Sequence, residues 1–167
     1  MEKFAYKIER FIQKTLFLYE KIYEVLLKEK IHIIDMNVDA LWETISQKKS
    51  LAMSIEVIRQ EAVCLFNQTY PGLEKDAAVL TFSYIVRIMN IPCEKKEELR
   101  KLILSIDTIK SDVKGLASDN SKFINDHLAV IDGIFSTLID RPDKGNYSSF
   151  GNFLKQGGKN HLISAKV

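Results

Sequence analysis

The segment "CEKKEELRKLILSIDTIKSDVKGLASDNSKFINDHLAVIDGIFSTLI", residues 93–139, decides the fold of this chain. Mostly apolar residues recur in it at alternating steps of three and four, and no proline interrupts them. The seam formed in this way consists of Leu99, Leu102, Ile106, Ile109, Val113, Leu116, Asn120, Phe123, His127, Val130, Ile134 and Leu138. This period predicts one amphipathic helix, which at 1.5 Å per residue would be roughly 70 Å long. Pro92 suits the start of such a helix, because its missing N–H costs nothing there.

Two further long helices precede this one. Residues 2–34 show the same period, with Phe4, Ile8, Phe11, Thr15, Leu18, Ile22 and Val25 on one face. A second helix begins after Asp35 or Asn37, either of which can cap it, and Pro71-Gly72 ends it. Each of the two is roughly 50 Å long, and the short loop between them predicts an antiparallel hairpin. The last helix must therefore extend beyond the hairpin or pack against another helix along its excess length.

The segment 77–89, "AAVLTFSYIVRIM", is apolar nearly all round, which predicts a short third helix that is covered on more than one side. No strand-like alternation occurs in the sequence. The predicted fold class is therefore all-α, an elongated antiparallel helical bundle with coiled-coil-like packing. We expect residues 1–140 to form this bundle domain, because Arg141-Pro142 ends the last helix, and residues 141–167 to form a C-terminal tail. Trp42 lies at helical spacing and is expected in the core.

Composition narrows the class of protein. The net charge is +2, but residues 141–167 carry five Lys or Arg against one Asp, so a basic tail follows a mildly acidic body. So small a net charge argues against nucleic-acid binding. The N-terminus is interrupted by charges, unlike a signal peptide, and no uncharged stretch is long enough to span a bilayer. We therefore expect no stable membrane insertion. Because Cys64 and Cys93 are the only cysteines, we also expect a cytoplasmic protein without a disulfide framework.

The patterns that carry chemistry are all incomplete. Glu29 and His32 have the Glu-x-x-His spacing of di-iron bundles, but those sites need the motif twice and the second copy is missing. His127 invites comparison with histidine phosphotransfer domains, although "HLAVIDG" lacks the lysine of their His-x-x-Lys-Gly motif. Cys93 has no His or Asp beside it to activate the thiol. We therefore expect no catalytic residue, no metal ligand and no cofactor, and a phosphotransfer role would rest on His127 alone.

Two polar residues interrupt the apolar seam of the last helix. Asn120 and His127 occupy successive equivalent heptad positions, where a polar side chain commonly fixes the register of helix packing at some cost in stability. The same heptads can pack within one chain or between two chains, so the sequence leaves a homodimer open.

The tail is polar but carries a few large apolar side chains. Glycine, asparagine and serine dominate "KGNYSSFGNFLKQGGKN", residues 144–160, which has too little apolar surface to fold alone. Phe150, Phe153 and Leu154 have the spacing of one helix face, and Tyr147 precedes them. This pattern is typical of a segment that orders on a partner as a short amphipathic helix in an apolar groove.

The chain resembles the FlgN family, the bacterial flagellar export chaperones of the hook-filament junction proteins. The resemblance is carried by the helical hairpin, by "LTFSYIV" at residues 80–86, by Asn120 within the long last helix, and by Tyr147 and Gly151 in "YSSFG". In the family an Asp-Ala-Arg segment commonly lies between the tyrosine and the glycine, whereas this chain has Ser148, Ser149 and Phe150. The aromatic residue and the glycine are thus the shared parts of the tail motif.

The resemblance implies a cytoplasmic secretion chaperone that is not an enzyme. It implies that the clients are the first and third hook-associated proteins, which are kept from assembling prematurely, and that the docking partner is the flagellar export gate. The residues expected to bind partners are Asn120, Tyr147, Phe150, Gly151, Phe153 and Leu154. The alternative from the residues alone is a coiled-coil adaptor or structural tether without client specificity, for which the tail would be dispensable.

Overall fold

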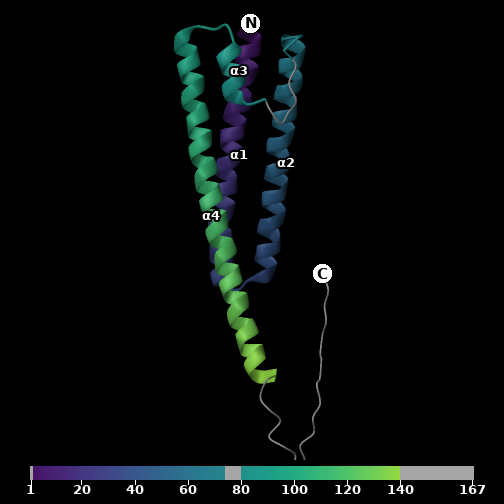
Figure 1. Ribbon diagram of the computed structural model, residues 1–167, viewed down its shortest axis with the longest axis vertical. Coiled ribbons are helices and arrows are strands. Elements are labelled where there is room, and N and C mark those ends of the chain that lie inside the picture. Colours follow the sequence, from purple (N-terminus) through teal and green to yellow (C-terminus); the bar gives the residue numbers. More distant parts are fainter. Residues whose placement is uncertain (1, 74–79, 140–167) are drawn as a thin grey trace, which may run out of the picture. The chain divides into compact units, whose positions relative to one another are not determined.

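The computed structural model describes residues 2–73 and 80–139 (Figure 1). Within these residues the chain is all-α: α1 spans Glu2–Ile34, α2 Val38–Thr69, α3 Phe82–Ile88 and α4 Cys93–Ile139. The predicted fold class, with long first, second and last helices and a short third helix, is confirmed. No helix in the described ranges is long and apolar enough to cross a membrane. The chain divides into two units, Met1–Ile124 and Asn125–Val167, and α4 contributes to both.

The turn between α1 and α2 is a tight helix-capping motif. Met36 has φ of 52°, and its N–H donates to the carbonyl of Ile33 over 3.1 Å, while the N–H of Asn37 donates to the carbonyl of His32 over 2.9 Å. This is the Schellman arrangement, in which glycine usually takes the left-handed position that Met36 occupies here. Asn37 then caps α2, because its Oδ1 accepts from the N–H of Ala40 over 3.1 Å. Of the two predicted caps, Asn37 is therefore the one used.

Helix α3 begins later than its sequence suggested. Gly72, with φ of 92°, follows the end of α2 as predicted from Pro71-Gly72, and α3 starts only after Thr81. The Thr81 hydroxyl accepts from the N–H of Tyr84 over 3.2 Å, which satisfies a donor that the first turn leaves unpaired. Residues 77–79 of the predicted helix lie outside the described residues.

The core of the first unit gathers around α3. Ile85, Val86 and Met89 are each 1% exposed, which confirms that this segment is covered on more than one side. They pack with side chains of the three long helices, namely Phe4, Ile8, Ile12, Phe66, Leu99, Ile103 and Ile106. Complete burial of a side chain of this size contributes about 1.5–3 kcal/mol. The excess length of α4 is thus partly used to cover the short helix.

An ion-pair network links α1 to the start of α4. The Lys95 ammonium lies 2.8 Å from a carboxylate oxygen of Glu9 and 2.9 Å from one of Glu98. Hydrogen bonds to Glu9 and then Glu98 raise the pKa of Lys95, and the bond from Lys95 lowers the pKa of Glu98. Since these side chains are partly exposed to solvent, the ion pairs contribute only modestly to the stability of the contact between the two helices.

Candidate partner-binding site

The C-terminal part of α4 exposes one continuous apolar face in the second unit. We call this the α4 apolar face, and its members, each between 42% and 63% exposed, are Leu128, Val130, Ile131, Ile134, Phe135 and Leu138. At 3.6 residues per turn they occupy an arc of about 160°, which also contains the partly exposed His127. Between Asn125 and Leu138 the remaining arc holds polar or small residues, namely Asn125, Asp126, Ala129, Asp132, Gly133, Ser136 and Thr137.

Such a face is typical of a surface that binds another helix. Large apolar side chains that gather on one exposed face mark interaction sites, whereas single exposed ones are ordinary. The heptad pattern predicted an apolar seam that runs as far as Leu138. In the structure the seam is still apolar at Val130, Ile134 and Leu138, but these residues are exposed instead of buried. Sequence periodicity therefore located the apolar face but gave no sign that this part of it is exposed.

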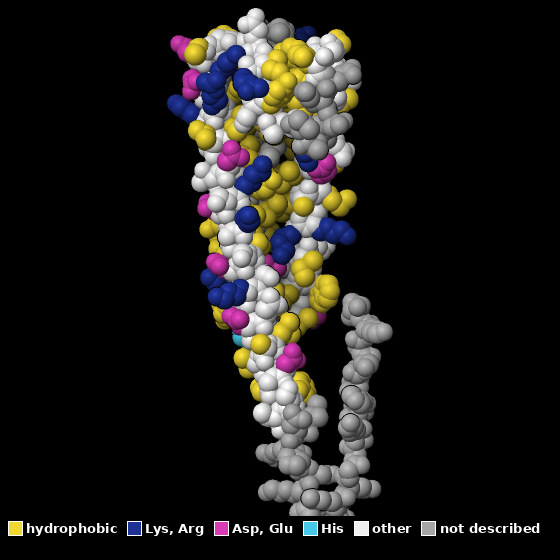
Figure 2. Space-filling view, viewed as in Figure 1, with side chains coloured by type: hydrophobic (Ala, Val, Ile, Leu, Met, Phe, Trp, Pro, Cys, Tyr) yellow, Lys and Arg dark blue, Asp and Glu magenta, His cyan; other side chains and the backbone are white. Residues whose placement is uncertain are grey.

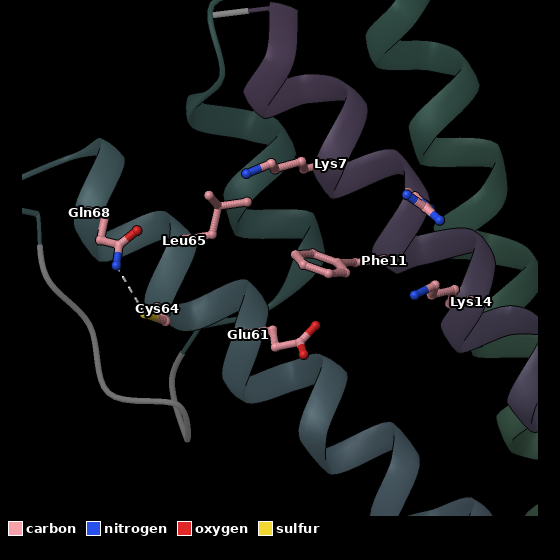
Figure 3. A pocket seen from close by; sticks show the side chains of 8 residues that line it. Lys7, Phe11, Lys14, Glu61, Cys64, Leu65 and Gln68 are labelled. Carbon is pink, nitrogen blue, oxygen red and sulfur yellow. Dashed lines mark hydrogen bonds between the residues drawn. The ribbon is translucent and has the colours of Figure 1, made fainter.

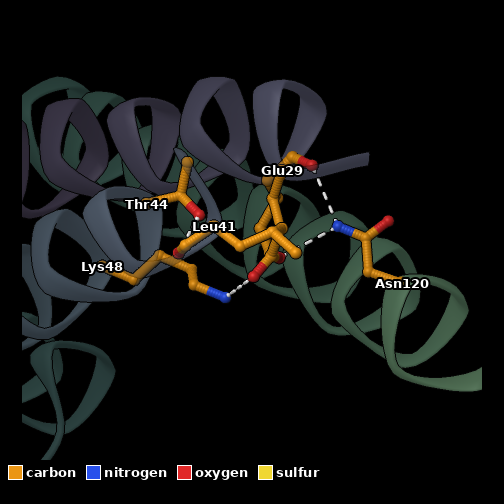
Figure 4. Close-up of polar contacts among 6 residues, drawn as sticks. Glu29, Leu41, Thr44, Lys48 and Asn120 are labelled. Atoms are coloured by element: carbon orange, nitrogen blue, oxygen red, sulfur yellow. Dashed lines mark hydrogen bonds and ion pairs between the residues drawn. The ribbon is translucent and has the colours of Figure 1, made fainter. Parts of the chain in front are cut away.

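Asn120 lies in the buried part of the same helix, at a junction of three helices (Figure 4). It is 3% exposed, and its Nδ2 donates to the Leu26 carbonyl over 2.9 Å and to Oε2 of Glu29 over 3.0 Å. The other carboxylate oxygen of Glu29 accepts a hydrogen bond from the Lys48 ammonium of α2. Glu29 is 4% exposed, so the three helices share one buried polar network.

This geometry suits the register role predicted for Asn120. Moving α4 along α1 would break both hydrogen bonds and leave the Glu29 carboxylate with fewer partners in a buried place. The Oδ1 of Asn120 accepts no hydrogen bond from the described residues. Whether Asn120 also contributes to partner binding stays a prediction.

A basic ridge on α1 borders a shallow cavity beside α2 (Figure 3). Lys3, Lys7, Arg10 and Lys14 follow one another at helical spacing on α1, and none of them forms an ion pair with a described residue. The cavity has a volume of about 400 Å³ and is lined further by Phe11, Glu61, Cys64, Leu65 and Gln68. It is open, and three of its lining residues, Lys7, Arg10 and Lys14, are basic, so it suits loose contact with an acidic surface.

An exposed apolar cluster at the α1–α2 turn was missed by sequence reasoning. Trp42 is 67% exposed, which corrects the expectation that it lies in the core, and around the turn Ile31, Ile34, Met36, Val38 and Ile45 are also exposed. Helical spacing alone could not reveal this, because these residues lie beyond the reach of α3 and of the core it organises.

The residues weighed for chemistry are not brought together. Glu29 bonds to Lys48 and Asn120, and no group of three or more His, Cys, Asp or Glu side chains able to hold a metal occurs in the part of the chain that the structure describes. Cys64 and Cys93 are exposed free thiols. The predicted tail residues Tyr147, Phe150, Gly151, Phe153 and Leu154 lie outside the described residues, so their role stays a prediction.

Comparison with known proteins adds one finding. A protein-family model described as FlgN protein matches residues 4–153, which is most of the chain. The matched range contains α2, α3, α4 and all of α1 but its first two residues. It also contains Tyr147, Phe150, Gly151 and Phe153, and it ends just before Leu154. Searches of curated proteins and of solved structures found no match.

Proposed function

Because this chain belongs to the FlgN family, the flagellar export chaperones, we propose that it is a cytoplasmic chaperone for hook-associated proteins of the hook-filament junction. In this proposal it binds the first and third hook-associated proteins, prevents their premature assembly and delivers them to the flagellar export gate. It acts by binding alone, without a cofactor and without catalysis.

The observation that carries the proposal is the α4 apolar face. Six large apolar side chains stand exposed on one side of a helix that leads directly into the tail. A client whose terminal helices are amphipathic would cover this face, and burial of Ile131, Phe135 and their neighbours would contribute about 25 cal/mol for each Å² removed from water. While they are covered, the client's termini cannot pair with those of another client.

The tail is proposed to complete the contact. Tyr147, Phe150, Phe153 and Leu154 are the apolar anchors in a polar segment, and Gly151 lies among them. Ordering of the tail on the client would cost conformational entropy and so moderate the affinity, which suits a chaperone that has to release its cargo.

A coiled-coil adaptor or tether is the second candidate, because the α4 apolar face could equally pair with a second copy of the chain. Calorimetric titration separates the two functions. The full chain and a chain ending at Asp140 are titrated with the purified hook-associated proteins of the same genome, and with the same proteins shortened by their terminal helices as the control.

We expect the full chain to bind the intact clients, the shortened clients to fail, and loss of residues 141–167 to weaken binding at least tenfold. Full affinity of the chain ending at Asp140 would contradict the role given to the tail. Absence of binding by either chain, together with self-association in light scattering, would favour the adaptor.

A further inference from the structure

A groove in the first unit lies between α2 and α4, with α1 as its floor. It has a volume of about 320 Å³, and its lining includes Tyr19 from α1, Ile55 and Val63 from α2, and Phe82 at the start of α3. Figure 2 shows a hollow in which apolar side chains lie between rims that carry Lys and Arg. The volume is enough for one or two large apolar side chains, and it lies at the lower end of the range of small-molecule sites.

Helix α3 shows what kind of element these walls accept. Its seven residues pack onto all three long helices and bury Ile85 and Val86 almost completely. It is roughly 10 Å long, whereas α2 with 32 residues is roughly 48 Å long. The groove opens where α3 begins, so a stretch of the same three walls continues there without a fourth helix among the described residues.

The charges around the groove indicate the sign of its occupant. Lys110 lies over the ring of Tyr19, with its ammonium 5.4 Å from the ring centroid, and it forms no ion pair with a described residue. Arg59 lines the opposite wall beside Glu56, at 3.5 Å. Two cations and one anion therefore border a groove whose walls are largely apolar, which favours an apolar side chain flanked by a carboxylate.

We propose that this groove binds an amphipathic helix of the client protein. The client helix lies against the three long helices in the stretch that α3 leaves uncovered, and it places an acidic residue near Lys110. This inference rests on the proposed chaperone function and adds to it a second contact, in the first unit, that is separate from the α4 apolar face. The helix inserts apolar residues three or four positions apart between Ile55 and Tyr19.

Four variants of the full chain test the proposal by calorimetric titration with the first hook-associated protein. Ile55→Trp fills the groove, and its control Val57→Trp adds the same ring two positions further along α2, where Val57 is 53% exposed. Lys110→Glu reverses the charge at the rim, and its control Lys101→Glu makes the same change about half a turn around α4. Lys110 and Lys101 are both exposed, so neither charge change should disturb folding.

We expect Ile55→Trp to weaken client binding at least tenfold and Lys110→Glu about fivefold, with changes below twofold for the two controls. Wild-type affinity in both groove variants would overturn the proposal that the client binds in the groove, and would leave the proposed chaperone function intact. Failure of the unmodified chain to bind the client would overturn both. A client-independent dimer that Ile55→Trp converts to a monomer would assign the groove to a second copy and overturn the proposal.

Discussion

Asn120 donates a hydrogen bond from its side-chain amide to the buried carboxylate of Glu29 over 3.0 Å, and so joins α4 to α1 inside the bundle. Lys48 of α2 donates to the same carboxylate from the other side. A buried charge with two good partners is tolerated, but removal of one partner leaves it undercompensated in a place that water reaches poorly. The stability of the three-helix junction should therefore depend on the complete network.

Lys48→Met should destabilise the chain by about 2 kcal/mol, less than for a fully buried pair because the lysine side chain is 28% exposed. The double variant E29Q/K48M should recover most of that loss, since the new amide is neutral and can donate to Oδ1 of Asn120, which lacks a partner among the described residues. Urea unfolding measures the free energy of unfolding of both variants. Lys49→Met is the control, and equal losses in K48M and K49M would contradict a contribution from the network.

Met36→Gly should stabilise the chain by about 1 kcal/mol. Met36 holds φ of 52° in the turn between α1 and α2, a conformation that costs a residue with a Cβ about 1–2 kcal/mol. Its side chain is 64% exposed, so little packing is lost with it. Met36→Ala keeps the Cβ and should leave the midpoint of thermal unfolding nearly unchanged. If Ala and Gly at this position raised the midpoint equally, backbone strain would not be the cause.

The helices could be predicted from the sequence because each is long and strongly periodic. The period of residues 93–139 predicted the full length of α4. One of the two predicted caps, Asn37, begins α2, and Pro71-Gly72 follows its end. The start of α3 was placed too early, because an apolar run does not say where the Thr81 hydroxyl will cap the helix. Boundaries set by one local hydrogen bond are thus less visible in sequence than elements set by many residues.

The candidate site was less accessible to sequence reasoning than the fold. A heptad seam looks the same whether a neighbour covers it, as at Leu99 and Ile106, or leaves it exposed, as at Ile134 and Leu138. Likewise the groove near Tyr19 exists because α3 is short. Only the three-dimensional packing shows that the walls formed by the long helices continue beyond α3. In the tail, Phe150, Phe153 and Leu154 came from their helical spacing, whereas Tyr147 and Gly151 carry the family resemblance.

Stability should fall above about pH 10, because three groups then lose protons more readily in the unfolded chain. Burial raises the pKa of Tyr19, against a smaller opposite effect of Arg59, and burial also raises the pKa of Tyr70. Hydrogen bonds to Glu9 and Glu98 raise the pKa of Lys95. For each, the folded state binds its proton more tightly than the unfolded state, so the stabilisation present below the unfolded pKa is lost as pH rises through the folded pKa.

Tyr70→Phe tests one part of this alkaline loss. The Tyr70 hydroxyl is buried without a hydrogen-bond partner among the described residues, so its removal should stabilise the chain by about 1 kcal/mol at pH 7. Urea unfolding between pH 8 and about pH 11 should show a smaller fall in stability than in the unmodified chain. Tyr6→Phe, at a side chain that is 65% exposed, is the control and should change neither quantity. Destabilisation by Tyr70→Phe at pH 7 would mean that the hydroxyl has a partner after all.

If the proposed function holds, Phe135→Asp should weaken client binding strongly and leave folding unchanged. Phe135 is 57% exposed on the α4 apolar face, so the substitution removes little packing and should alter the free energy of unfolding by less than about 0.5 kcal/mol. In the complex, by contrast, the new carboxylate would be buried against apolar client side chains, which should weaken binding by a factor of at least 100, or about 2.7 kcal/mol. Ser136→Asp places the same charge on the polar side of the helix and is expected to bind the client normally. Calorimetric titration with the first hook-associated protein measures affinity, and circular dichroism on heating checks the fold. Equal affinities for F135D and S136D would show that the α4 apolar face does not contact the client.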